Sequence, residues 1–379
     1  MADNKDKKVL NVPALRFPEF TGKWERHKLS EVCSFYSGGT PSSSKKEYYN
    51  GNIPFIRSGE LHKDNTELFI TEAGLSNSAA KLVETGDLLL ALYGATSGDI
   101  AISKIKGAIN QAILCIRTKQ NKKFIESVWN KHVERLLQTY LQGGQGNLSA
   151  DIVKNIPFYF ANSEEQDKLA KFISLLDKRI ATQNKIIEDL RLLRDAISVY
   201  LLSPKSDWKC YKVSEIADIG RGRVISSKEI ANQNNPRYPV YSSQTSNEGI
   251  MGYLDDYAFD GEYITWTTDG ANAGTVFYRN GRFNCTNVCG TLKLHYQFDA
   301  YYCSLVLANA TKKYVSANLA NPKLMNNTMA AIKLYLPPFQ EQKRMAQLFR
   351  KMDENITLEH KLLLSYQRQK HYLLQQIFI

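Results

Sequence analysis

Side chains that can bind phosphates and base edges are concentrated in several polar, glycine-rich stretches of the chain. Glycine lets the backbone approach a phosphate, and serine, threonine and lysine contact its oxygens. Arginine, glutamine and asparagine can make paired hydrogen bonds to guanine or adenine. In the first half the candidate contact residues are Ser37, Thr40, Ser42, Ser43, Lys45, Lys46, Arg57, Thr96, Gln142, Gln145 and Asn147. In the second half they are Arg221, Arg223, Ser243, Gln244, Thr245, Asn247, Thr268 and Asn272.

Motifs of the common catalytic classes are absent from the sequence. It contains no G-x-x-x-x-G-K-[ST] loop, no H-E-x-x-H, no EF-hand loop and no G-x-S-x-G. Residues 52–55 and 155–158 (both NIPF) resemble the tetrad of amino-methyltransferases but lack its second proline, and residues 336–339 (LPPF) lack its polar first residue. We interpret all three as strand entries and helix leads. Cysteines and histidines follow no metal-ligand or nucleophile–base pattern, so no catalytic and no metal residue is predicted.

The charge balance favours a polyanionic partner. The net charge is +11 and the isoelectric point is near 9.1, although 38 acidic residues argue against a wholly basic arm. No apolar run reaches the roughly 18 residues that span a bilayer. The polar first residues are not typical of a signal peptide. We therefore expect a cytoplasmic protein.

An internal repeat organises the chain. The segment beginning at Glu164 matches the segment beginning at Gln340 without a gap, at an offset of 176, so that Asp177 falls on Asp353. A weaker similarity relates the sequence around Trp24 to the sequence around Trp208. In a third match, Gly94 and Gly98 correspond to Gly270 and Gly274. A repeat of this length predicts a duplicated domain and excludes a solenoid, whose units have roughly 20 to 50 residues.

Each copy ends in a long helix with apolar residues at heptad a and d positions. The first seam comprises Leu169, Ile173, Leu176, Ile180, Ile187, Leu190, Ile197 and Leu201, and the second Met345, Phe349, Met352, Ile356, Leu363, Tyr366, Leu373 and Ile377. Each helix should be about 55–60 Å long and should need a partner helix to cover its seam. The alternative is two amphipathic helices that each pack on their own domain.

Polar residues interrupt both seams and suggest a register. A parallel pair would place Arg194 against Lys370 inside the seam, which is unfavourable. An antiparallel pair in which facing residue numbers add up to 553 places Arg194 against Glu359 and Gln183 against Lys370. We therefore predict an antiparallel intramolecular pair with this register.

The sequence pattern in the remainder of each half predicts a β-sheet followed by a helix. Short apolar and β-branched segments lie at residues 55–61, 87–94, 99–105 and 112–118, and again at 238–243, 261–268, 274–281 and 289–296. Helical patterns follow from residues 124 and 299. The fold class is α+β: two mixed α/β domains and two long antiparallel coiled-coil helices, with a pseudo-two-fold repeat. The predicted boundaries are a lead segment (1–23), domain 1 (24–160), a central helix (161–205), domain 2 (206–336) and a C-terminal helix (337–379).

The order of these motifs resembles the specificity subunits of type I restriction–modification systems. The resemblance rests on residues 16–20 (RFPEF), 37–42 (SGGTPS) and 51–55 (GNIPF), on Ile-Pro followed by Glu165-Gln166 and a long helix, and on residues 336–342 (LPPFQEQ). It covers nearly the whole chain. The first half departs from it with Ala161-Asn162 where the second has Pro337-Pro338.

The resemblance implies a function. Each domain would be a target recognition domain that reads one half of a bipartite, asymmetric sequence in double-stranded DNA. The helices would act as a spacer and dock two modification (methyltransferase) subunits, and restriction (translocase and nuclease) subunits would join the complex. This chain would be non-catalytic and carry no cofactor, because S-adenosylmethionine, ATP and Mg²⁺ belong to the partner subunits. The alternatives are a stand-alone DNA methyltransferase or nuclease with a degenerate motif, and a coiled-coil adaptor for proteins only.

Overall fold

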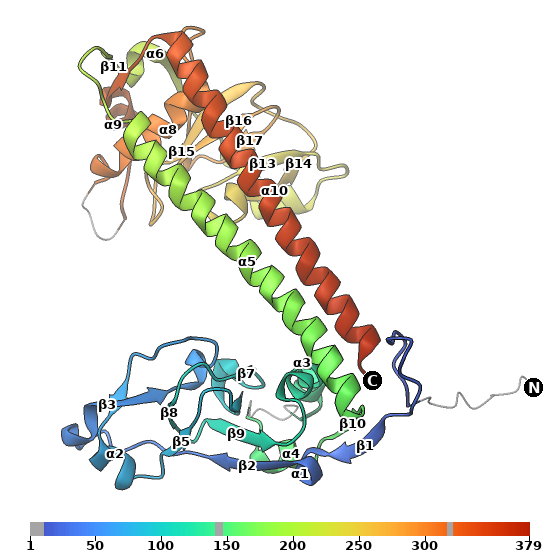
Figure 1. Ribbon diagram of the computed structural model, residues 1–379. Coiled ribbons are helices and arrows are strands. Elements are labelled where there is room, and N and C mark those ends of the chain that lie inside the picture. Colours follow the sequence, from blue (N-terminus) through green and yellow to red (C-terminus); the bar gives the residue numbers. More distant parts are fainter. Residues whose placement is uncertain (1–10, 141–146, 317–320) are drawn as a thin grey trace, which may run out of the picture. The chain divides into compact units, whose positions relative to one another are not determined.

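The computed structural model describes residues 11–140, 147–316 and 321–379, and the chain forms two compact units. Unit 1 comprises residues 1–185 and 361–379, and unit 2 comprises residues 186–360. In Figure 1, unit 1 is the blue-to-green part of the ribbon together with the red C-terminal end of α10. The domain boundaries given above remain predictions.

Unit 1 contains two four-stranded sheets and a separate strand pair. The antiparallel pair is β1 (Glu25–Lys28) with β10 (Pro157–Phe160). The first sheet has the order β2 (Cys33–Ser37), β9 (Ile113–Thr118), β6 (Leu88–Ala91), β7 (Ile100–Ile102), and is antiparallel throughout. The second has the order β4 (Phe69–Ile70), β3 (Tyr49–Ile56), β8 (Gly107–Ile109), β5 (Lys81–Val83), in which β3 and β8 are parallel.

Helices connect and cover these strands. They are α1 (Leu29–Val32), η1 (Lys46–Tyr48), η2 (Ser58–Glu60), α2 (Glu72–Ser76), η3 (Gly94–Thr96), α3 (Lys122–Tyr140), α4 (Ala150–Asn155) and the beginning of α5 (Ser163–Leu201). The predicted segment 55–61 is a strand only as far as Ile56, because Arg57 starts the 3₁₀ turn that Glu60 caps.

Unit 2 repeats this plan. Its strand pair is β11 (Lys209–Lys212) with β19 (Lys333–Leu336), and its larger sheet has the order β12 (Ala217–Arg221), β18 (Cys289–Leu294), β15 (Glu262–Thr267), β16 (Val276–Asn280). The smaller sheet has the order β14 (Ile250–Leu254), β13 (Tyr238–Tyr241), β17 (Asn284–Cys285), with β13 and β17 parallel. The helices are the second part of α5, α6 (Val213–Ile216), α7 (Ser227–Ala231), η4 (Ser246–Gly249), α8 (Ala300–Ala310), η5 (Thr311–Lys313), α9 (Asn326–Ala331) and the first part of α10 (Phe339–Ile377). The predicted α+β duplication is confirmed.

A buried glutamine ties the long helix to the sheet domain in each unit. Gln166 donates to the carbonyl of Ala161 and accepts from the amide of Asn121, the residue that precedes α3. Gln342 makes the equivalent bonds to the Pro337 carbonyl and to the amide of Asp299, which caps α8. Both glutamines are 2% exposed. The repeated Glu-Gln pair of the sequence therefore has a structural role, because the side-chain amide of each glutamine hydrogen-bonds backbone groups at the ends of two elements.

Each core also receives the end of a long helix. In unit 1, the ring of Phe378, just past α10, lies with its centroid 5.4 Å from that of Phe124 and 6.3 Å from that of Trp24. In unit 2, Leu202 just past α5 is buried in the core that contains Trp208. Phe378 and Leu202 are related by the offset of 176. The apolar helix ends are thus part of the domain cores.

The heptad seams are confirmed, because every predicted a and d residue is buried or half-buried. Within each unit the two helices are antiparallel: Arg179 reaches Tyr366 in unit 1, and in unit 2 Arg191 reaches His360 while Arg194 reaches the earlier Asp353.

The predicted register is wrong. Arg194 pairs with Asp353 rather than Glu359, and Lys370 pairs with Asp177 at 2.5 Å rather than with Gln183. In both ion pairs the residue numbers add up to 547 instead of 553, and the two pairs are equivalent under the 176-residue offset. The reason is that the long cationic side chains reach past the seam to half-buried carboxylates beside it, where both charges keep some hydration.

Candidate nucleic-acid interface

Three connections meet at one edge of each unit, and equivalent backbone hydrogen bonds hold them there. The connection after β6 is joined to the connection before β9 by Leu92 N to Ala112 O, and the equivalent bond in unit 2 is Thr268 N to Val288 O. The segment before α4 is joined to the same edge by Leu148 N to Leu92 O. Its equivalent before α9 is Leu324 N to Thr268 O. Each partner shifts by 176 residues, so the two edges have the same backbone construction.

Left-handed glycines shape the turn after β6 and after β15. Gly94 and Gly270 have φ of +75° and +90°, and Gly98 and Gly274 have φ of +86° and +83°. A residue with a side chain rarely adopts this backbone conformation, so glycine is present at these positions in both units although the rest of the repeat has diverged. Thr96 and Asn272 occupy the same place between these glycines, and both are half-buried.

The edge of unit 2 carries a charged cluster. Arg221, the last residue of β12, donates from Nη2 to Thr268 Oγ1 at 2.8 Å and to Asp269 Oδ2 at 3.4 Å. Lys323 approaches the other oxygen of Asp269 at 3.6 Å. The structure therefore unites Arg221 and Thr268, but the prediction of Thr268 as a contact residue is wrong, because its side chain is 0% exposed and instead accepts from Arg221. The cluster also contains Asp269 and Lys323, which the sequence reasoning missed. Lys323 is the repeat equivalent of the predicted Asn147.

The edge of unit 1 is less charged. Gly38 and Gly39 leave no room for a side chain, because an added Cβ would lie 1.7 Å from the Ile109 carbonyl oxygen and 2.6 Å from Ala79 Cβ respectively. Thr40 donates to Gln111 at 2.7 Å, a second residue that the sequence reasoning missed. Lys45 donates to the Tyr48 hydroxyl at 2.9 Å, which raises the pKa of Lys45. This backbone packing fixes the polar loop that follows β2.

Arg57 is paired with a buried carboxylate, although its own side chain is 41% exposed. Its guanidinium donates to Glu60 and, at 2.6 Å, to the exposed Glu67. Glu60 is 3% exposed and also accepts from Thr66 Oγ1 at 3.0 Å and from the amides of Arg57 and Glu67. Burial by itself would raise the pKa of Glu60, but these hydrogen bonds outweigh it and lower the pKa to about 2.

The corresponding part of unit 2 is built around a buried arginine. Arg279 is 6% exposed, with its guanidinium carbon 3.6 Å from the ring centroid of Tyr241 and 4.4 Å from that of Phe277. It donates to the carbonyl of Glu248 at 2.6 Å. Burial lowers the pKa of Arg279 from its ordinary value. The turn that it contacts is left-handed at Asn247, Glu248 and Gly249, with φ of 48°, 52° and 85°.

The other predicted contact residues differ in exposure and in the partners that hold them. Several are held by the protein itself: Ser42 bonds Ser44, Arg223 pairs with Glu229, Gln244 donates to the Ile250 carbonyl, and Asn272 donates to the Ser243 carbonyl. Ser43, Lys46, Asn147, Thr245 and Asn247 are exposed, and Ser37 is half-buried at the end of β2. Gln142 and Gln145 lie outside the described residues.

The methyltransferase-like tetrads are structural. Residues 52–55 lie within β3, residues 155–158 span the end of α4 and the start of β10, and residues 336–339 join β19 to α10. The interpretation is therefore confirmed for residues 155–158, a strand entry, and for residues 336–339, a helix lead, whereas residues 52–55 lie inside β3 rather than at its entry. Within the described ranges, His, Cys, Asp and Glu side chains form no group of three that could hold a metal ion. Nor does any helix of this part of the chain have the length and apolarity to cross a membrane.

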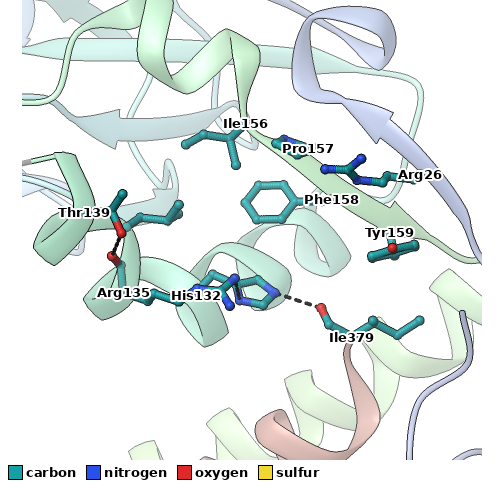
Figure 2. A pocket seen from close by; sticks show the side chains of 10 residues that line it. Arg26, His132, Arg135, Thr139, Ile156, Pro157, Phe158, Tyr159 and Ile379 are labelled. Atoms are coloured by element: carbon teal, nitrogen blue, oxygen red, sulfur yellow. Dashed lines mark hydrogen bonds between the residues drawn. The ribbon is translucent and has the colours of Figure 1, made fainter. Parts of the chain in front are cut away.

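A basic cavity of about 450 Å³ lies where α10 ends on α3 and β10 in unit 1 (Figure 2). Its lining includes Arg26, His132 and Arg135. The His132 ring stacks on Phe158 with centroids 5.5 Å apart and donates from Nε2 to the Ile379 carbonyl at 2.8 Å. Burial lowers the pKa of His132, and the cations of Arg135 and Lys131 lower it further. The neutral tautomer with its proton on Nε2 fits both this bond and the bond that Nδ1 accepts from Arg135.

Comparisons with known proteins give a consistent result. Residues 21–192 and 205–365 match the family described as "Type I restriction modification DNA specificity domain". Two putative type I specificity subunits of Mycoplasma pneumoniae are similar. One is 47% identical over 140 residues (36% of this chain and 74% of the relative), and the other is 36% identical over 197 residues (51% and 81%). The crystal structure of a type I restriction–modification S subunit from M. genitalium has the same fold, with a TM-score of 0.65 and 17% identity over 97% of this chain and 99% of that one.

Proposed function

Because this chain belongs to the type I restriction–modification DNA specificity family, we propose that its two units are target recognition domains that each read one half of a bipartite, asymmetric DNA sequence. The observation that carries this proposal is the pair of equivalent edges. Both have the same three connections and the same backbone hydrogen bonds, but unit 2 presents Arg221, Asp269 and Lys323 where unit 1 presents polar, mostly uncharged groups. One frame with different side chains suits two different half-sites.

The long helices would dock two modification subunits, which restriction subunits would join. Large apolar side chains remain exposed along them: Leu192 is 61% exposed, Val199 72% and Leu358 60%. Exposed apolar side chains on these helices are candidate contacts for a protein partner. The chain itself would be non-catalytic and cytoplasmic, with S-adenosylmethionine, ATP and Mg²⁺ bound by its partners.

Two measurements test this function. The full chain should bind duplex DNA with a preferred sequence. The logarithm of its association constant should fall linearly with the logarithm of the salt concentration. When S-adenosylmethionine is supplied, methyl transfer to DNA should require the modification subunits. Methyl transfer by the chain alone would establish the enzyme alternative, and DNA retention without sequence preference or salt dependence would favour the adaptor alternative.

A further inference from the structure

Two loops occupy equivalent places in the two units. In unit 1, the loop of residues 57–68 connects β3 to β4. It begins after Ile56, the residue of β3 that pairs in parallel with Ile109 of β8. In unit 2, residues 242–249 leave β13 after Tyr241 pairs in parallel with Cys285, and they lead into β14. Ile109 and Cys285 are related by the offset of 176, so the two loops are the same connection in diverged form.

The loop of unit 1 is organised around a buried anion. Glu60 accepts hydrogen bonds from both ends of the loop, through the Arg57 and Glu67 amides, the Arg57 guanidinium and the Thr66 hydroxyl. The same Thr66 Oγ1 lies 2.9 Å from the Phe55 carbonyl oxygen, so its single proton is shared between the Glu60 carboxylate and β3, and it anchors the loop to that strand. One carboxylate therefore holds backbone amides from both ends of the loop in place.

The loop of unit 2 is organised around a buried cation. Three successive left-handed residues, Asn247 to Gly249, turn the Glu248 carbonyl toward Arg279. Left-handed backbone at the two non-glycine positions costs free energy, and such strain persists only where neighbouring groups enforce it. Arg279 supplies that constraint from β16. Its repeat equivalent in unit 1 is Ser103, which bonds the Ile105 carbonyl instead, so the cation is specific to unit 2.

We propose that Glu60 and Arg279 are positioning residues, each of which fixes the conformation of one recognition loop and thereby sets the base preference in one half of the DNA target. The proposal rests on the proposed function. Paired hydrogen bonds to a base edge require donor and acceptor positions fixed to a fraction of an ångström. Phosphate contacts from other segments tolerate more movement, so loss of either buried charge should relax sequence preference more than total affinity.

The test uses the full chain assembled with its modification subunits and a DNA library randomised in both half-sites. The variants are Glu60→Gln and Arg279→Met. The controls are Glu67→Gln, an exposed acid that contacts the same Arg57, and Arg282→Met, an exposed arginine between β16 and β17. In Glu60→Gln, the preference for the correct base over the other bases should fall about tenfold or more in one half-site. In Arg279→Met, the same loss should occur in the other half-site. In each variant the base preference at the remaining half-site should change by less than about twofold. The controls should retain both preferences.

A rescue variant separates positioning from general damage. Glycine adopts positive φ at little cost, so Glu248→Gly added to Arg279→Met should restore part of the lost preference. Equal loss in both half-sites, or unchanged discrimination in both variants, would overturn the inference. A wild-type complex without sequence preference would instead overturn the proposed function on which it rests.

Discussion

Glu60 offers a quantitative test of how strongly a buried charge stabilises unit 1. Its pKa is lowered from 4.5 to about 2, and its side chain is 3% exposed. One pKa unit corresponds to about 1.36 kcal/mol, so the ionised form contributes on the order of 3 kcal/mol to the stability of unit 1. Because the folded pKa is depressed, this contribution is complete above pH 4.5 and is lost as the pH falls toward 2.

The perturbation is Glu60→Gln, which keeps the shape but removes the charge. With a urea dependence of about 2–3 kcal/mol per molar, the midpoint for unit 1 should fall by about 1 M at pH 7. Hydrogen exchange at the amides of Arg57 and Glu67 should accelerate, since both donate to Glu60. The difference between variant and wild type should shrink as the pH is lowered below 4.5. A difference that is negligible at pH 7, or that does not depend on pH, would refute this reasoning.

Three further predictions follow from individual contacts. Exchanging Arg194 and Asp353 together should preserve thermal stability far better than reversing either charge alone, and equal losses in all three variants would exclude this ion pair. The pKa of His132 is lowered in the folded state, so protonation favours the unfolded state and the stability of unit 1 should decline as the pH falls below about 6.5. In thermal unfolding measured from pH 8 to 5.5, His132→Gln should remove this decline. Gly290→Ala would place a Cβ 2.1 Å from the buried Trp266 ring and should abolish the cooperative unfolding transition of unit 2, with normal Trp266 fluorescence as the contrary result.

The sequence predicted the features that depend on periodic patterns. Short apolar segments located β6, β7 and β9 of unit 1 and β13, β15, β16 and β18 of unit 2, and the heptads located α5 and α10. The strands β2 and β12 and most short strands of the smaller sheets were not among the predicted segments. The repeat predicted the equivalence of the two units, and the structure adds that Gln166 and Gln342 make equivalent buried hydrogen bonds. Each of these features depends on many residues that point to the same structure, so a single departure does not hide it.

The features that depend on single side chains were harder to predict. Arg57 and Arg223 looked like free contact residues, yet each is paired with a carboxylate three or six positions later, a spacing visible in the sequence. Glu60 and Arg279 carry no motif, and their burial follows from how the loops pack on the strands. The helix register failed because its ion pairs use residues beside the seam, where no apolar pattern marks them.

The central claim, that the two units read separate halves of one DNA target, can be tested by domain exchange. Residues 24–150 would be replaced by the corresponding domain of another specificity subunit, and modified adenines would be mapped in DNA from cells that also carry the modification subunits. The account predicts a new sequence in one half of the modified site and an unchanged sequence in the other. A site that changes in both halves, or in neither, would contradict it.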